Sequence, residues 1–248
     1  MDNIVNIDKL PQDVRQKFVP YLKSMLELHK GKIISVFIYG SAAGASYVAK
    51  SSDINSAFIF RDLNFADLEK SLKIIHAGKK NKITAPLFLT KEYIDSSLDI
   101  FPIEFLDMKE NHVLLFGEDI LSQLKIKGEY IRLFCEQQIK GKLIRIRQSY
   151  LEVGLNPKEL RALLKTSLNT LMPVFRNLIR LKGKHPPTHK PEIIHELCQA
   201  FQLNPEIFLA IYQDITKEEK IAQQQLSVIF ENFINEMKKL AGEVDHLS

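Results

Sequence analysis

The sequence predicts an α+β fold, in which a small mixed β-sheet with flanking helices is followed by an all-α helical bundle. Short runs of β-branched and aromatic residues, which are typical of strands, occur in the first half of the chain. The second half shows apolar residues at helical intervals and repeated helix-start signals. The pattern changes near residues 121–130, so we expect two domains, residues 1–125 and residues 126–248.

Several segments of the first half are predicted strands. Residues 32–39 (KIISVFIY) and 54–60 (INSAFIF) are short, apolar and rich in β-branched and aromatic side chains. Residues 85–90 (APLFLT) and 100–107 (IFPIEFLD) are two further candidates. The segment HVLLFG predicts an edge strand that ends at Gly117.

Two helices are expected among these strands. Residues 12–29 form an amphipathic pattern, and Pro20 predicts a kink within it. The segment NFADLEKSLKIIHA shows helical spacing after Asn64, a residue type that caps helix starts.

The second half carries three helix-start signals. Asn156 is followed by Pro157 and Glu159, Asn204 is followed by a proline, and Thr216 is followed three residues later by a glutamate. The Pro-rich residues 182–191 predict a loop. Helices are expected near residues 129–153, 157–182, 191–201, 205–213 and 217–241, packed as an antiparallel bundle.

Composition narrows the class of protein. A chain of 248 residues with 45% hydrophobic residues is typical of globular proteins, and no apolar run approaches the roughly 20 residues that span a membrane. The first residues carry acids where a signal peptide would carry a basic region. We therefore expect a cytoplasmic protein that does not contact membranes. Cys135 and Cys198 lack the spacing of metal ligands, which predicts buried packing thiols and no zinc site.

Charge is distributed unevenly along the second half. Residues 128–190 hold 13 Lys and Arg against 4 Glu, a net of +9, whereas residues 191–248 hold 4 Lys against 10 acids, a net of −6. This pattern fits solvated helix faces that pair with each other, and it also fits a basic surface that faces a polyphosphate.

The strongest chemical pattern lies between residues 38 and 60. A predicted strand ends at Gly40, which permits close backbone approach, and Ser41 adds a hydroxyl and an amide suited to anionic oxygens. Asp53 and Asn55 stand two apart at the start of the next predicted strand, so their side chains share one face. Two carboxylates in that arrangement bind divalent metals together, but residue 55 is an amide.

The Gly-Ser turn, the gap that follows and Asp53 on the next strand resemble the polymerase-β-type nucleotidyltransferase superfamily. The helical half is similar to the bundle of its small members, such as aminoglycoside nucleotidyltransferases. The resemblance implies that Mg²⁺ ions, held by three acids, align an acceptor hydroxyl with the α-phosphate of a nucleoside triphosphate, with ATP as the expected nucleotide. It also implies a small hydroxylated acceptor or a protein acceptor. Here Asn55 departs from the Asp-x-Asp pair of the superfamily and weakens the metal site.

The third acid of the resemblance has two candidates. Glu104 stands between apolar residues on the predicted strand 100–107 and is the preferred catalytic and metal-binding residue, together with Asp53. Asp107, on the opposite face of that strand, is the alternative.

A polar helical face follows in the second half. Arg132, Glu136 and Lys140 recur at four-residue steps, which is the spacing of surface ion pairs. The alternative places this face at the site, with Glu136 as general base and Arg132 as a nucleotide-binding residue.

Two function classes follow from these residues. The first is a Mg²⁺-dependent nucleotidyltransferase weakened by Asn55, and the second is an inactive relative that binds a nucleotide or a protein partner. A nucleic-acid binder is not expected, because aromatic residues do not alternate with the basic ones. The sequence leaves a homodimer open.

Overall fold

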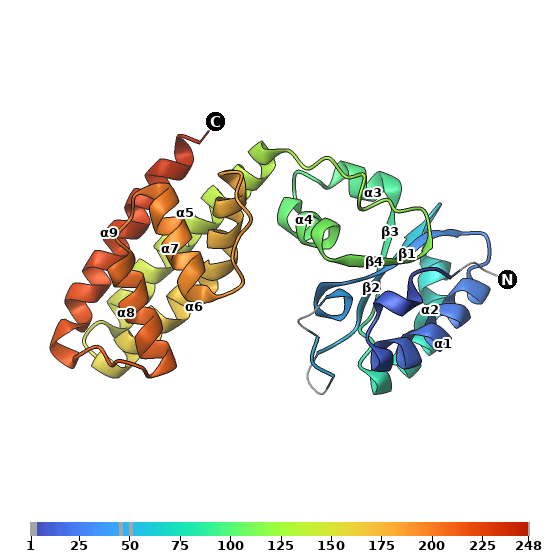
Figure 1. The fold of residues 1–248 in the computed structure, drawn as a ribbon, viewed down its shortest axis with the longest axis horizontal. Coiled ribbons are helices and arrows are strands. Elements are labelled where there is room, and N and C mark those ends of the chain that lie inside the picture. Colours follow the sequence, from blue (N-terminus) through green and yellow to red (C-terminus); the bar gives the residue numbers. More distant parts are fainter. Residues whose placement is uncertain (1–3, 45–46, 50–51, 248) are drawn as a thin grey trace. The chain divides into compact units, whose positions relative to one another are not determined.

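The computed structural model describes residues 4–44, 47–49 and 52–247. The chain divides into two compact units, Met1–Ile126 and Lys127–Ser248, which we call the sheet unit and the helical unit. Strands occur in the first unit, and the described residues of the second form helices joined by turns and loops (Figure 1). The predicted α+β class is confirmed.

The sheet unit contains a four-stranded sheet in the order β3-β2-β1-β4. β1 (Ile33–Tyr39) pairs antiparallel with both β2 (Asn55–Phe60) and β4 (His112–Gly117). β3 (Leu87–Thr90) pairs parallel with β2. The sheet is therefore mixed, and the predictions of an edge strand ending at Gly117 and of strands near residues 32–39, 54–60 and 85–90 are confirmed.

Helices cover both faces of this sheet (Figure 1). α1 (Gln12–Leu28) and α2 (Phe65–Gly78) pack on one face, and α3 (Lys91–Ser96) and α4 (Pro102–Glu110) pack on the other. Because side chains alternate along a strand, each strand contributes to both cores. The first core includes Phe18, Leu22, Val36, Ile38, Phe58 and Phe60, and the second includes Phe37, Ala57, Ile59, Ile94, Phe105 and Met108.

The predicted strand 100–107 is wrong, because these residues lead into and form most of helix α4. Pro102 stands at the first helical turn, where a missing N–H costs nothing. Glu104, Asp107 and Glu110 are all exposed at three-residue steps, which is the period of a helix face. That spacing was visible in the sequence, but the alternation of Ile103, Glu104 and Phe105 suggested a strand instead.

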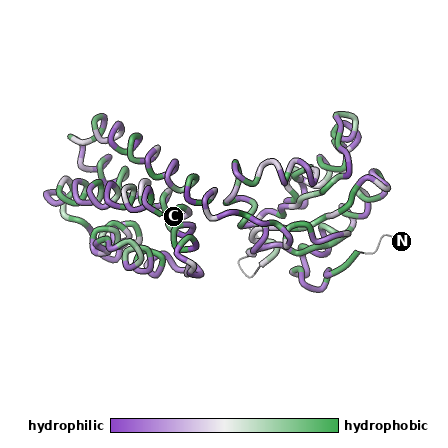
Figure 2. Tube along the Cα trace, turned by 90° about the horizontal axis from the view of Figure 1, so that it is seen from above, coloured by the Kyte–Doolittle hydropathy of each residue, from purple (hydrophilic) through white to green (hydrophobic). Residues whose placement is uncertain are grey.

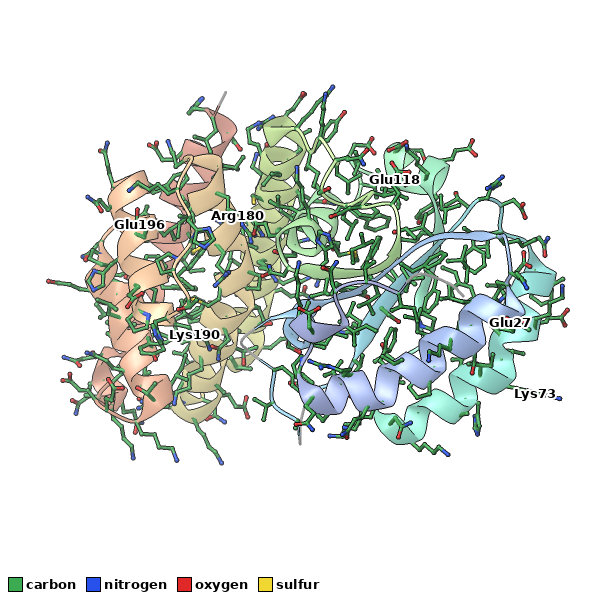
Figure 3. The ribbon with its side chains drawn as sticks, turned by 45° about the vertical axis from the view of Figure 1, so that its right-hand side comes forward. Glu27, Lys73, Glu118, Arg180, Lys190 and Glu196 are labelled. Carbon is green, nitrogen blue, oxygen red and sulfur yellow. The ribbon has the colours of Figure 1, made fainter. Side chains whose placement is uncertain are left out.

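The two helices that the sequence predicts in this unit, α1 and α2, are both present. α1 contains Pro20 and continues to Leu28. Asn64 caps α2 as predicted: its side chain accepts a hydrogen bond from the Asp67 amide, and the Asp67 side chain accepts one from the Asn64 amide. Glu27 on α1 and Lys73 on α2 point away from the sheet (Figure 3).

The helical unit is built around α6. Figure 2 shows hydrophilic and hydrophobic residues alternating along its helices, as expected for helices with one buried face. α6 packs against α5, α7, α8 and α9. None of the described helices combines the length and the hydrophobicity of a membrane-spanning segment. The helices are α5 (Gly128–Val153), α6 (Pro157–Leu181), α7 (Lys190–Phe201), α8 (Pro205–Thr216) and α9 (Leu226–Asp245).

One helix start in this unit was predicted wrongly. Thr216 does not cap a helix, because it is the last residue of α8 and its hydroxyl lies 3.1 Å from the carbonyl oxygen of Gln213. Lys217 then ends α8 in the left-handed conformation, with a φ of 65°. α9 begins at Leu226, nine positions later than expected. The caps at Asn156 and Asn204 are as predicted.

Both cysteines are buried, as predicted. Cys135 and Cys198 are 0% and 3% exposed. Burial raises the pKa of each thiol to about 12, which keeps both protonated at neutral pH.

Candidate functional site

The candidate site begins where β1 ends. Gly40 has a φ of 72°, a conformation that favours glycine, and opens the 3₁₀ turn Gly40–Ala43. Its amide donates to the carbonyl oxygen of Asn111 at 3.2 Å, so the turn is fixed beside the start of β4. Ser41 follows in this turn and is half-buried.

Asn55 lies next to this turn. In the β1–β2 register, Asn55 is opposite Tyr39, the residue before Gly40. A methyl group placed on Gly40 would lie 3.6 Å from Asn55 Nδ2. Asn55, Ala57 and Ile59 stand at every second position of β2, so their side chains share one face of the sheet. This is the face that α3 and α4 cover. The structure thus brings Gly40 and Asn55 together across 15 positions of the printed sequence.

Thr84, a residue outside the predicted motif, orients the Asn55 amide. Thr84 Oγ1 donates to Asn55 Oδ1 at 2.9 Å. Thr84 lies three residues before β3, next to Ile83, which forms a parallel bridge with Ile54. Because β3 runs parallel to β2, the residues before these two strands lie at the same edge of the sheet. The parallel pairing of β2 with β3 places Thr84 beside Asn55. The sequence alone does not show this pairing, so it did not predict a role for Thr84.

Asp53 is exposed and precedes β2, two residues before Asn55. The segment between the turn and Asp53 is held in part by Tyr47, whose hydroxyl donates to Asp13 at 2.7 Å. Burial and this hydrogen bond raise the pKa of Tyr47 to about 12. Four residues of the predicted Gly-Ser to Asp53 gap, at positions 45–46 and 50–51, lie outside the described residues.

The third acid does not stand on a strand. Glu104 is exposed in the first turn of α4, so its placement on a sheet strand is wrong. Asp107, the alternative, is one helical turn before Asn111, whose carbonyl oxygen accepts from Gly40. At 1.5 Å per residue, Asp107 is roughly 6 Å and Glu104 roughly 10 Å from Asn111 along the helix axis. Of these two acids, Asp107 is therefore nearer to the turn along α4.

The donor groups do not fit two Mg²⁺ ions held by three acids. β1, β2, β3 and β4 contain no Asp or Glu. The amide oxygen of Asn55 is neutral and already accepts a hydrogen bond from Thr84, whereas Mg²⁺ prefers carboxylate oxygens. Within residues 4–44, 47–49 and 52–247, no group of three or more His, Cys, Asp or Glu side chains is placed to hold a metal ion. The implied metal centre is therefore not built from the described residues.

In the helical unit, the polar face of α5 forms a chain of ion pairs. Arg132 Nη1 lies 2.8 Å from Glu136 Oε2, and Lys140 Nζ lies 2.7 Å from Glu136 Oε1. Lys140 also pairs with Asp245 at 2.8 Å. The four-residue spacing thus makes helix-surface pairs, and the roles of Arg132 and Glu136 at a nucleotide site stay predictions.

The fold of the chain is similar to that of a solved structure, although its sequence matches no family. No protein-family model matches the chain. No curated protein matches it. Among solved structures, the chain is similar to the crystal structure of a spectinomycin adenyltransferase from Enterococcus faecialis with ATP and spectinomycin, at a TM-score of 0.50 and 13% identity. The match covers 90% of this chain and 98% of that one. The chain therefore shares its fold with a nucleotidyltransferase.

Proposed function

We propose that the chain is a nucleotide-binding protein built on a nucleotidyltransferase fold, with ATP as the expected ligand, and that it lacks the metal-dependent transfer activity. The observation that supports this proposal is the position of Asn55. It lies beside the Gly40 turn, where the superfamily pattern has an acid, and no strand of the sheet supplies another carboxylate. A turn with exposed backbone beside an amide suits phosphate oxygens better than it suits Mg²⁺.

Calorimetric titration with ATP tests this function. We expect saturable binding to the wild type and weaker binding to Gly40→Ala, because an added methyl group would contact Asn55 Nδ2 and disfavour the positive φ. Gly31→Ala is the matched control, since Gly31 has a φ of 81° and a methyl group there would meet no atom within 4 Å. No heat of binding at millimolar ATP with the wild type would refute the proposal.

Nucleotidyl transfer to a hydroxylated acceptor is the second candidate. It is favoured by the shared fold with an adenyltransferase that was solved with ATP and an acceptor. Asp53 and Glu104 would be its catalytic acids and Glu136 its general base. The test is pyrophosphate release with Mg²⁺-ATP across a panel of hydroxylated small molecules. Release that disappears in Asp53→Asn would establish this candidate, and absence of release would support binding alone.

A further inference from the structure

We propose that the chain binds the triphosphate group without a divalent metal, through the Asn55 amide nitrogen that Thr84 holds turned toward the Gly40 turn. This inference rests on the proposed nucleotide binding and adds its metal independence and a positioning residue. It starts from the mismatch between the described donor groups and a Mg²⁺ centre.

The orientation of the Asn55 amide follows from the bonds of Thr84. The Thr84 backbone amide donates to the Ile54 carbonyl oxygen at 3.1 Å. The Thr84 hydroxyl is 3.2 Å from that same carbonyl but only 2.9 Å from Asn55 Oδ1. The hydroxyl carries a single proton, and we assign it to the nearer acceptor, the amide oxygen of Asn55. The NH₂ group of Asn55 is then the end that faces Gly40.

This NH₂ group is available for a ligand. Among the described residues, none accepts a hydrogen bond from Asn55 Nδ2. Asn55 is half-buried, and Gly40 places no side chain over the nitrogen. Asn55 Nδ2 is not fully buried, so a phosphate oxygen can reach it and form a charge-assisted hydrogen bond with it.

The same position with a carboxylate would act in the opposite sense. A carboxylate is an acceptor only, so it would take the Thr84 proton with one oxygen and present the other oxygen to the turn. That negative charge repels phosphate unless a cation lies between them. Asn55 therefore offers the ligand a direct donor at a position where a carboxylate would need a cation.

Titration with ATP and with inorganic tripolyphosphate, each in EDTA and in Mg²⁺, tests the inference. We expect the dissociation constants of the wild type to differ by less than about threefold between the two conditions. Asn55→Asp should bind both ligands at least about tenfold more weakly in EDTA, since one charge-assisted donor is lost. The control Asn156→Asp adds the same charge at an exposed helix cap of the helical unit and should leave affinity unchanged.

Thr84→Val tests the positioning role. It removes the hydroxyl but keeps the side-chain shape, so the affinity for ATP in EDTA should fall in Thr84→Val. The double variant Asn55→Ala, Thr84→Val should bind no more weakly than Asn55→Ala alone, because Thr84 acts through the Asn55 amide. Equal affinity of Asn55→Asp and wild type in EDTA would overturn the inference, as would binding by the wild type that requires Mg²⁺. Binding in Mg²⁺ alone would still support nucleotide binding, whereas no binding in either condition would remove the proposed function itself.

Discussion

Among the described residues, each unit buries one carboxylate that pairs with a cation. The two carboxylates differ in whether their cations would keep another partner if the carboxylate were removed. Asp67 in the sheet unit and Asp214 in the helical unit are 1% and 2% exposed. Asp67 lies 2.9 Å from Lys32 and completes the cap of α2. Asp214 pairs with Arg161, lies 3.2 Å from Lys165 and accepts from the Ile221 amide at 3.2 Å.

The cations that pair with these carboxylates differ in whether a second carboxylate lies within reach. Lys32 also pairs with Asp62 at 2.8 Å, so it keeps a partner when Asp67 is removed. Around Asp214, no second described carboxylate pairs with Arg161 or Lys165. The comparison indicates that the helical unit depends more strongly on Asp214 than the sheet unit depends on Asp67.

The largest expected effect is therefore that of Asp214→Ala. Removing one partner of a buried pair costs about 3 kcal/mol at the lower end of the usual range, which applies because both cations are partly exposed. Asp67→Ala should cost less, because Lys32 retains Asp62. Hydrogen exchange of the full chain, resolved by peptide, measures the loss of protection in each unit separately.

The exposed residue Asp245 supplies the control for this comparison. It pairs with Lys140 at the surface, and Asp245→Ala should leave protection of the helical unit unchanged. A larger loss for Asp67→Ala than for Asp214→Ala would contradict the argument from alternative partners.

Local signals predicted more of the fold than of the site. Asn156 and Asn204 correctly predicted the starts of α6 and α8, because a cap and the turn that it caps are neighbours in sequence. By contrast, the helical state of Glu104 depended on Phe105 and Met108 packing onto the sheet, a non-local contact. Thr84 was missed for the same reason, since its role depends on the parallel pairing of β2 with β3.

Helix caps provide a second, smaller test of the two units. Asn156 accepts from the Lys158 and Glu159 amides at 3.1 and 3.4 Å, and Asn64 accepts from the Asp67 amide at 3.2 Å. Asn156→Ala and Asn64→Ala should each lower the free energy of unfolding by about 1 kcal/mol. The substitutions to Asp keep an acceptor and should restore most of it. A loss in Asn64→Asp as large as in Asn64→Ala would show that Asp67 repulsion, not capping, dominates there.

The smallest expected effect is a pH dependence confined to the sheet unit. His29 is 3% exposed, and its Nε2 lies 2.7 Å from Ser71 Oγ. Burial lowers the pKa of His29, with Lys70 and Lys32 adding to the shift, while the nearby Asp67 carboxylate opposes it.

The unfolded chain therefore binds more protons at this histidine than the folded one, so stability falls as pH drops below the unfolded pKa of about 6.5. For one such group, the loss between pH 7 and pH 6 is at most about 0.7 kcal/mol. Hydrogen exchange at the two pH values, corrected for the intrinsic rate, should show this loss in the sheet unit. The loss should vanish in His29→Gln, whose amide can still donate to Ser71. Stability that rises on acidification, or an equal loss in His29→Gln, would show that another group controls the titration.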